Sequence, residues 1–400
     1  MTTSNFNLCF LCQSQKNSRW RTGITFNPLS MNPSVLQLSN PSILPTIALL
    51  CGGVSPEHEV SMNSARNIYK AIDKKKYQVE VIGVSRKGQW YHLPVEAFMK
   101  LSAVEGKVGR KLALAPGQEN AIVYKTGLGK FPKIDAVFPI IHGPFGEDGT
   151  LQGLLAILGL PFVGPDALGS SVGMDKDFTK RLLRDAGIPV APWVTLFKHE
   201  TPDYQVIVKK LGYPLFVKPA NMGSSVGVSK AENEKELKAA IELAFRFDIK
   251  ILVEQGIEGR EIETAVLGNR ENAQVSGIGE IVMAQGFYDY ESKYISADAA
   301  KVIIPAENVS AEATEKIRQT ALKAYLALGL EGLSRMDVFL AKDGTVYVNE
   351  PNTLPGFTNI SMYPKLWEAA GIAYPDLIDR LIQLAIERHR RNGALQRTRA

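Results

Sequence analysis

Two acids, an arginine and an asparagine are spaced for a divalent-cation site in the stretch LSRMDVFLAKDGTVYVNEPN, residues 333–352. The Asp343-Gly344 pair predicts a β-hairpin with a two-residue turn. In that register four side chains face one another on one side of the sheet. The facing pairs are Asp337 with Glu350 and Arg335 with Asn352. Mg²⁺ prefers such oxygen ligands, together with substrate phosphates.

A simpler interpretation of the hairpin is a salt bridge between Arg335 and Asp337 on a solvated face. Two facing acids would repel each other without a cation, so the metal site is favoured. The register depends on the turn, and a turn of odd length would shift it.

A glycine-rich loop and two lysines indicate a phosphate site. Lys218 directly follows an apolar strand at the start of VKPANMGSSVGVSK, residues 217–230, and Lys176 lies upstream. Glycines at both ends of GSSVG allow close approach of backbone amides, which can donate to phosphate oxygens. The lysine precedes the glycines, which is the reverse of a Walker A loop. The simpler interpretation of Ser224-Ser225 is a polar turn.

Two further loops follow predicted strands, at the edge where open parallel sheets usually bind ligands. In GGVSPEHEVS, residues 52–61, Glu57 could stabilise a helix start or bind an ammonium group. HGPFGEDG, residues 142–149, begins with His142, which taken alone is more often structural. Neither loop has the G-x-G-x-x-G pattern of a dinucleotide-binding fold.

Strands alternate with helices along most of the chain, which predicts an α/β fold with a parallel sheet in its first part. A helix capped by Asp175 is expected to turn Phe178, Leu182 and Leu183 inward. The stretch 86–132 is poorly patterned and is interpreted as an insertion. The long irregular stretch 284–301 is expected to be functional, because such loops are otherwise uncommon. Strands are expected at 46–51, 77–84, 135–141, 215–218, 251–254, 261–267 and 277–283, and helices at 151–158, 233–245, 311–328 and 375–390.

Composition narrows the class of protein. A net charge of only +5 over 400 residues argues against nucleic acid as a partner, and the apolar runs are too short to span a membrane. Three cysteines favour free thiols in a reducing compartment over a disulfide framework or a zinc site. The first 45 residues are rich in Ser, Asn, Thr and Pro and hold no acid, which indicates a disordered extension or, as the second hypothesis, an organelle transit peptide.

Taken in order, these motifs closely resemble the D-alanine–D-alanine ligase family, which has the ATP-grasp fold. The matching segments are GGVSPEHEVS, HGPFGEDGT, MDK, VKPANMGSSVGV, VEQGIEGREIE, FYDYESKY, SRMDVF and NEPNTLPGFT, and they cover residues 46 to 385. The resemblance implies an extension at 1–44, an N-terminal α/β substrate domain at 45–169, a central ATP-grasp lid domain at 170–260 and a C-terminal domain at 261–400 that carries the metal site and the ω-loop.

The resemblance also implies roles for individual residues. The catalytic set is Glu57, Ser224, Tyr294, Arg335 and the amide of Gly356, and the ATP-binding set is Lys176, Lys218, Ser225, Glu254, Ile257 and Glu261. His142, Lys293 and Ser361 are implied to bind D-alanine, and Asp337, Glu350 and Asn352 to hold two Mg²⁺ ions, with Mn²⁺ as a substitute.

The implied activity is ATP-dependent ligation of two D-alanines through an acyl phosphate, for peptidoglycan precursor synthesis. A cytoplasmic homodimer without nucleic-acid or membrane partners is expected. The main competing hypothesis is a ligase that uses D-lactate or D-serine as the second substrate, although Tyr294 favours an amine. Three further hypotheses are a different ATP-grasp ligase, a nicotinamide-dependent dehydrogenase, which the missing fingerprint disfavours, and an inactive nucleotide-binding protein.

Overall fold

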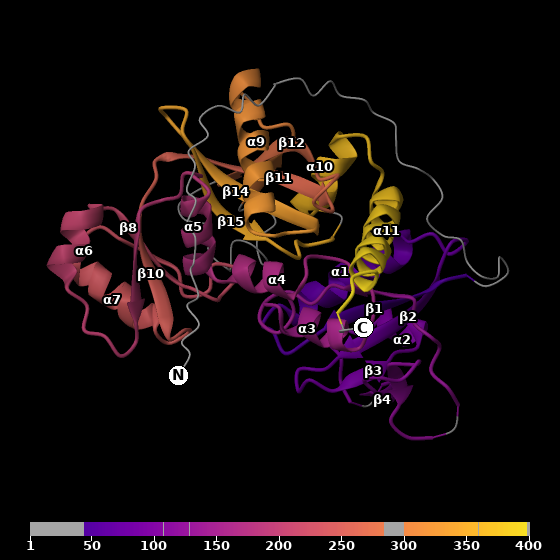
Figure 1. Ribbon diagram of the computed structural model, residues 1–400. Coiled ribbons are helices and arrows are strands. Elements are labelled where there is room, and N and C mark those ends of the chain that lie inside the picture. Colours follow the sequence, from indigo (N-terminus) through magenta and orange to yellow (C-terminus); the bar gives the residue numbers. More distant parts are fainter. Residues whose placement is uncertain (1–43, 107, 128, 284–299, 359, 398–400) are drawn as a thin grey trace, which may run out of the picture. The chain divides into compact units, whose positions relative to one another are not determined.

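The computed structural model describes residues 44–106, 108–127, 129–283, 300–358 and 360–397. Within these residues the strands form three sheets (Figure 1). The expected extension at 1–44 lies outside the described residues except for its last residue. Strands and helices alternate through most of the described chain, as the α/β prediction requires.

The first sheet has six strands in the order β5-β4-β3-β2-β1-β6. Only β2-β1-β6 are parallel, so the prediction of a parallel sheet is right for these three strands and wrong for β3, β4 and β5 on the other side of the sheet. The edge strands come from the stretch 86–132, whose pieces of three to five residues are too short to show a period. The elements are β1 Thr46–Gly52, α1 His58–Ala71, β2 Gln78–Val84, β3 Trp90–His92, α2 Val95–Phe98, β4 Arg110–Leu114, β5 Ile122–Tyr124, β6 Ala136–Pro139 and α3 Thr150–Ile157.

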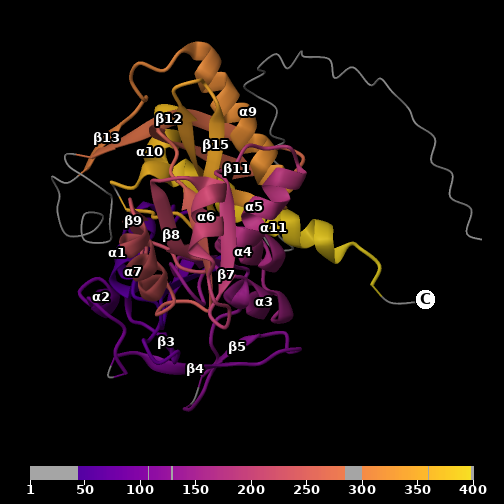
Figure 2. The ribbon, with the colours of Figure 1, turned by 90° about the vertical axis from the view of Figure 1, so that its left-hand side faces the viewer.

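The second sheet is antiparallel and has the order β7-β10-β8-β9. Figure 2 labels three of its strands, β7, β8 and β9. Helices α6 and α7 share an apolar core with one face of this sheet, to which Val217 and Val253 contribute. Because side chains alternate along a strand, their neighbours Lys218 and Glu254 lie on the opposite face. The elements are β7 Trp193–Phe197, α6 Tyr204–Leu211, β8 Leu215–Pro219, β9 Ser229–Ala231, α7 Glu234–Ala244 and β10 Lys250–Gln255.

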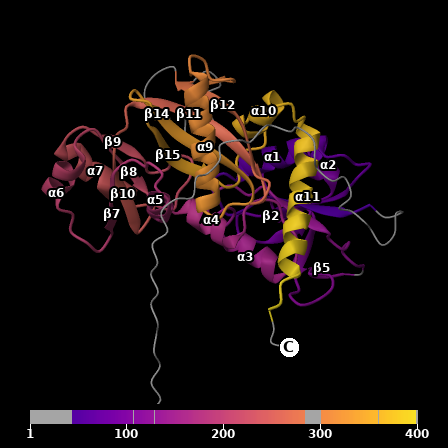
Figure 3. The same ribbon diagram turned by 45° about the horizontal axis from the view of Figure 1, so that its top comes forward.

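The third sheet is antiparallel and has the order β13-β12-β11-β14-β15. Figure 3 shows α9 across β11, β14 and β15, where its apolar side packs on Met336 and Val338. The neighbouring side chains of β14, Arg335 and Asp337, therefore point to the other face. The elements are β11 Gly259–Gly268, β12 Gln274–Met283, β13 Ala300–Ile303, α9 Ala311–Ala327, β14 Gly332–Ala341, β15 Val346–Asn352, α10 Met362–Ala369 and α11 Tyr374–Gly393.

Helices α4 (Ala167–Met174) and α5 (Lys176–Asp185) follow the first sheet. Asp175 caps α5 as predicted, by accepting hydrogen bonds from the amides of Asp177 and Phe178. The prediction that Phe178 and Leu182 point inward is wrong, because their exposed fractions are 54% and 40%, and Leu183 alone of the three is buried. The inward face of α5 is largely polar and carries Lys180, whose ammonium group lies at the site described below.

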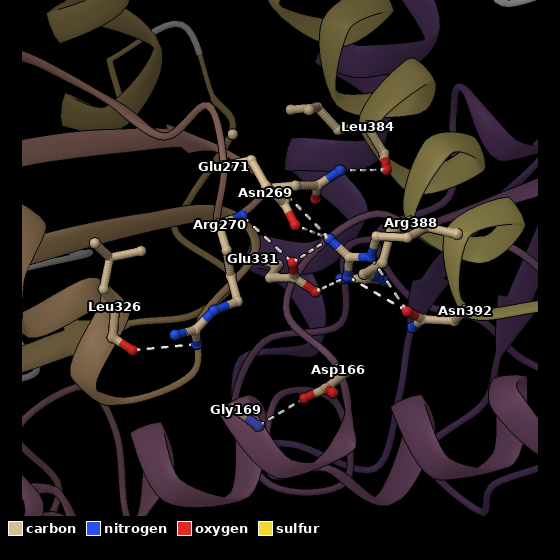
Figure 4. Close-up of polar contacts among 12 residues, drawn as sticks. Asp166, Gly169, Asn269, Arg270, Glu271, Leu326, Glu331, Leu384, Arg388 and Asn392 are labelled. Carbon is tan, nitrogen blue, oxygen red and sulfur yellow. Dashed lines mark hydrogen bonds and ion pairs between the residues drawn. The ribbon is translucent and has the colours of Figure 1, made fainter. Parts of the chain in front are cut away.

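The C-terminal helix α11 ties the third sheet to the chain that leaves the first. On the side of the third sheet, Asn269 donates a hydrogen bond to the carbonyl of Leu384 on α11 (Figure 4). Arg388 on α11 is buried and donates hydrogen bonds to the carbonyls of Phe162 and Gly164. One turn further along the helix, Arg391 forms a bidentate ion pair with Glu331, with both N–O distances at 2.8 Å. At the other end of α11, Asp379 accepts a 2.6 Å hydrogen bond from Tyr77 next to β2.

Replacing Arg388 by methionine is expected to lower the free energy of unfolding by about 3 kcal/mol, because two buried carbonyls lose their donors. Chemical denaturation measures this change. The exposed Arg390, two residues further on, offers a control: Arg390→Met should stay within about 0.5 kcal/mol of the wild type. An Arg388→Met variant as stable as the control would show that the bonds to Phe162 and Gly164 contribute little.

Candidate active site

The β14–β15 hairpin has the predicted pairing at the acids but a different turn. Asp337 faces Glu350 and Arg335 faces Asn352, as the sequence predicts. The turn has three residues, since the amide of Ala341 bonds to the carbonyl of Thr345 and Gly344 has a φ of +78°. This odd turn shifts the register, and an irregularity between Asp337 and Val338 shifts it back. The two deviations cancel before the acids are reached.

The four hairpin side chains form one polar cluster. Arg335 donates two hydrogen bonds of 2.7 Å to the carboxylate of Asp337, and the amide nitrogen of Asn352 donates another at 2.9 Å. Asp337 is buried with an exposed fraction of 3%. The salt bridge that competes with the metal interpretation is therefore present, but on a buried rather than a solvated face.

The acids meet the lysines of the predicted phosphate site. Lys176 lies 3.5 Å from the carboxylate of Glu350, and Lys218 donates to Asn349 of the same hairpin at 3.5 Å. Burial alone would lower the pKa of Lys218, but the charges of Glu254 and Glu350 outweigh it and raise that pKa. Lys176 of α5 and Lys218 of the second sheet therefore share one site with Glu254 of the second sheet and Glu350 of the third.

A buried carboxylate lies beyond the two lysines. Glu254 forms ion pairs with Lys218 at 2.8 Å and with Lys180 at 3.3 Å. Burial opposes its charge, yet the two ammonium groups lower the pKa of Glu254. Lys180 is a site residue that the sequence reasoning missed, although its spacing of four from Lys176 places both on one side of α5.

The glycine-rich loop and the first sheet meet at Glu57. Ser224 donates a 2.5 Å hydrogen bond to the carboxylate of Glu57. Ser224 and Ser225 both have positive φ, at 52° and 58°, which non-glycine residues rarely adopt and which costs on the order of 1 kcal/mol each. Backbone strain of this kind concentrates at functional sites. The strain favours the phosphate-loop interpretation over a polar turn.

Gly143 leaves room for Glu57. A Cβ at Gly143 would lie 2.6 Å from the hydroxyl of Ser55 and 2.8 Å from the carboxylate of Glu57, and its φ is +76°. Next to it, His142 is buried between the hydroxyl of Ser64 and the carbonyl of Leu354, at 3.2 and 3.0 Å. Burial lowers the pKa of His142, although Glu57 partly opposes this effect. The imidazole is therefore neutral near pH 7.

Four of the remaining predicted residues lie in the described part of the chain, and two lie outside it. Gly356 lies against Ser361, whose hydroxyl would be 2.9 Å from a Cβ at that glycine. The negative charge of Glu261 helps to raise the pKa of Lys218. Ile257 lies two residues after the end of β10, the strand that carries Glu254. Lys293 and Tyr294 lie outside the described residues, as does nearly all of the stretch 284–301.

Glu147, in the HGPFGEDG segment, is a second residue that the sequence reasoning missed. Its carboxylate accepts a 2.8 Å hydrogen bond from the amide of Gly143. Burial, followed by repulsion from Glu57, raises the pKa of Glu147 to about 8. A glutamate among the glycines that follow a predicted strand was a visible signal, but its partial burial was not.

This raised pKa predicts a pH-dependent stability. Between its usual pKa of 4.5 and about 8, Glu147 is protonated in the folded chain and ionised in the unfolded chain. Stability from this group is therefore present at low pH and lost as the pH rises through that window. The side chain in Glu147→Gln cannot ionise. The Tm of this variant minus the Tm of the wild type should therefore increase from pH 5 to about 8.

Thermal unfolding across this pH range makes the comparison. The matched control is Glu119→Gln, which changes an exposed glutamate paired with Lys133. Its Tm curve should run parallel to that of the wild type. A parallel curve for Glu147→Gln would refute the raised pKa.

The donor set of the hairpin suits a hard divalent cation. Asp337, Glu350 and Asn352 offer two carboxylates and an amide oxygen, which are ligands that Mg²⁺ prefers. Across the described ranges, no group of three or more His, Cys, Asp or Glu side chains is placed to hold a metal ion.

The antiparallel second and third sheets, whose lysines and acids meet in one site, define an ATP-grasp fold. Two family models match the chain, D-ala D-ala ligase N-terminus over residues 46–165 and D-ala D-ala ligase C-terminus over residues 182–383. The chain therefore belongs to the D-alanine–D-alanine ligase family.

Individual relatives agree with this assignment. The chain is 51% identical over 361 residues to D-alanine–D-alanine ligase A of Chromobacterium violaceum, with 88% of this chain and 98% of that protein covered. It is 49% identical over 360 residues to D-alanine–D-alanine ligase A of Escherichia coli K12, with coverage of 88% and 98%.

Solved structures resemble the fold as well. The D-alanine–D-alanine ligase of Coxiella burnetii matches with a TM-score of 0.77 at 39% identity, over 87% of this chain and 97% of that one. The VanG D-Ala:D-Ser ligase of Enterococcus faecalis matches with a TM-score of 0.75 at 36% identity, over 86% and 100%. In the described part of the chain, the helices are too short or too polar to cross a membrane.

Proposed function

We propose that this enzyme joins two D-alanines to D-alanyl-D-alanine at the expense of ATP, releasing ADP and phosphate for a peptidoglycan precursor pathway. The observation that carries the proposal is the 3.5 Å contact between Lys176, which is proposed to bind phosphate, and Glu350, which is proposed to bind the metal. The fold assignment and the relatives named above support it.

The lysines and acids are proposed to divide the triphosphate between them. Lys176 and Lys218 neutralise phosphate charge while the amides near Ser224 and Ser225 cover the transferred group. Glu254 and the backbone of Ile257 bind adenine, and Glu261 binds the ribose. Asp337, Glu350 and Asn352 would hold Mg²⁺ or Mn²⁺, with two ions as the finer proposal. Bound there, the metal would neutralise charge on the phosphate oxygens.

Glu57 is proposed to bind the ammonium group of the first D-alanine. The carboxylate is buried, with an exposed fraction of 8%, and is held by Ser224, so a bound ammonium group would be a desolvated ion pair. Neutral His142 lies one residue before Gly143, which packs on Glu57. The carboxylate of the bound D-alanine then attacks the γ-phosphate of ATP and becomes an acyl phosphate.

The second half of the reaction is proposed to take place beside Arg335. The amine of the second D-alanine attacks the acyl carbon, and phosphate leaves. Arg335 and the amide of Gly356 stabilise the oxyanion, which is typically worth about 3 kcal/mol per donor. Ser361, which adjoins Gly356, and Lys293 bind the carboxylate of this second D-alanine. Tyr294 is proposed to complete the network of Glu57 and Ser224.

A D-Ala:D-Ser specificity is the second candidate, because VanG is among the similar structures. The test is phosphate release and product identification with D-alanine, ATP and Mg²⁺, in which each component is omitted in turn. Release should require all three, and mass spectrometry should find the dipeptide. Parallel reactions with added D-serine or D-lactate measure the choice of second substrate. ADP formation that ignores D-alanine would refute the proposal.

The division into parts at 45–169, 170–260 and 261–400 stays a prediction, with the central part as a lid over ATP. Limited proteolysis with and without ATP would test it. A homodimer and a cytoplasmic location, or organelle targeting by the extension, also stay predictions, for which light scattering and cell fractionation are the tests.

A further inference from the structure

A buried glutamate that has no role in the proposed mechanism lies next to Arg335. Glu263 on β11 faces Asp337 on β14 in the strand pairing, so the two carboxylates point to the same side of the sheet. Their exposed fractions are 2% and 3%. Two buried acids at neighbouring positions repel each other unless a cation lies between them. Arg335 is that cation, with an Nε–O distance of 3.0 Å to Glu263.

The two acids hold Arg335 differently. The Nε–H and one terminal N–H of the guanidinium point at Asp337, at 2.7 Å each. Nε carries a single hydrogen, so its close contact with Glu263 is a charge contact rather than a directed hydrogen bond. Arg335 thus has a second anionic partner within reach, to which it can turn if Asp337 takes up another role.

Asp337 cannot give its oxygens fully to Arg335 and to a divalent ion at the same time. Once Asp337 turns to the ion, Arg335 needs another counter-charge, because its side chain is only 20% exposed and an unpaired guanidinium there is costly. Glu263 already lies 3.0 Å from Nε of Arg335. It is therefore a partner for the arginine.

We propose that Glu263 is a positioning residue that takes over Arg335 when Asp337 binds the divalent ion, and so holds the guanidinium toward the reacting carbonyl. This inference rests on the proposed function, because it needs both the metal role of Asp337 and the oxyanion role of Arg335. Loss of the Glu263 charge should therefore weaken metal binding and slow turnover together.

The test uses Glu263→Gln, which removes the charge and keeps the shape. The matched control is Glu280→Gln on β12, because Glu280 is also a largely buried acid of this sheet, and it is paired with Arg260 at 2.6 and 2.8 Å. Titration of Mn²⁺ in the presence of ADP, followed by electron paramagnetic resonance, measures metal affinity without turnover. Steady-state kinetics give kcat and the KM for ATP, and thermal unfolding measures any general loss of stability.

Glu263→Gln should bind Mn²⁺ about 10-fold more weakly and lose 10- to 100-fold in kcat, roughly the range for partners of metal-site residues. Glu280→Gln should keep a Mn²⁺ affinity and a kcat near those of the wild type, even if its Tm falls as much as that of Glu263→Gln. Glu263→Asp restores the charge and should recover most of the Mn²⁺ affinity, which a packing role would not predict. If Glu263→Gln does not fold, Glu263→Asp still allows the Mn²⁺ affinity and kcat to be measured with Glu263 replaced.

Mn²⁺ affinity and kcat of Glu263→Gln equal to those of the wild type would overturn the inference, and so would an equal loss in Glu280→Gln. These outcomes are separate from failure of the proposed function, which would show as no dipeptide from the wild-type enzyme. The Mn²⁺ titration reports on Glu263 in either case.

Discussion

Glu350→Ala is expected to slow phosphate release on the order of 10³-fold, because a divalent ion supplies several kcal/mol of charge stabilisation in phosphoryl transfer. Glu350 faces Asp337 across the hairpin and lies 3.5 Å from Lys176. Its loss removes one of the two carboxylates proposed for the metal and leaves that lysine without this partner. Phosphate release with saturating D-alanine, ATP and Mg²⁺ measures the effect.

The exposed Glu368 on α10 provides the control for this prediction. Glu368→Ala should turn over at the wild-type rate. Raising Mg²⁺ should recover part of the activity of Glu350→Ala if the residue acts through the ion. A Glu350→Ala enzyme with more than about a tenth of wild-type activity would contradict a role of this size.

Glu57→Gln is expected to lower kcat/KM for D-alanine by about 100-fold, since removing one member of a buried ion pair costs roughly 3 kcal/mol. Glutamine is nearly the same size and can still accept the hydrogen bond from Ser224, so the change isolates the charge. The KM for ATP should change little, because the glutamine keeps the hydrogen bond that joins this position to the loop proposed to cover ATP. Steady-state kinetics with each substrate varied in turn separate the two effects.

Glu59 lies two residues along α1, is exposed and pairs with Arg86, which makes Glu59→Gln a matched control. That variant should keep the wild-type KM for D-alanine. If Glu57→Gln and Glu59→Gln have the same kinetics, Glu57 does not bind the ammonium group.

The hairpin shows how far local rules reach. Period-two alternation and an Asp-Gly turn predict that Asp337 and Glu350 face each other, and they do. The details differ, because a three-residue turn is followed by an irregularity that restores the register. The predicted pairing of Asp337 with Glu350 was correct because the longer turn and the irregularity cancel. Short-range patterns cannot reveal a bulge that depends on tertiary packing.

The errors and omissions have a common physical cause. Phe178 and Leu182 fit an amphipathic pattern, but the inner face of α5 serves a polar site and leaves them exposed. Glu147 and Glu263 were missed because a glutamate in sequence gives no sign of its burial. Glu263 lies two positions after Glu261 on β11, so alternation alone could have placed both on one face.

The two attachments of α11 have a genetic consequence. The Tyr77–Asp379 bond and the carbonyl bonds of Arg388 secure the two ends of α11 to segments in the first half of the chain. A premature stop codon between Ser361 and Arg388 deletes the second attachment while leaving every proposed active-site residue encoded. Late nonsense alleles should therefore be as damaging in cells as early ones, and a screen for truncation tolerance should find its boundary beyond this arginine.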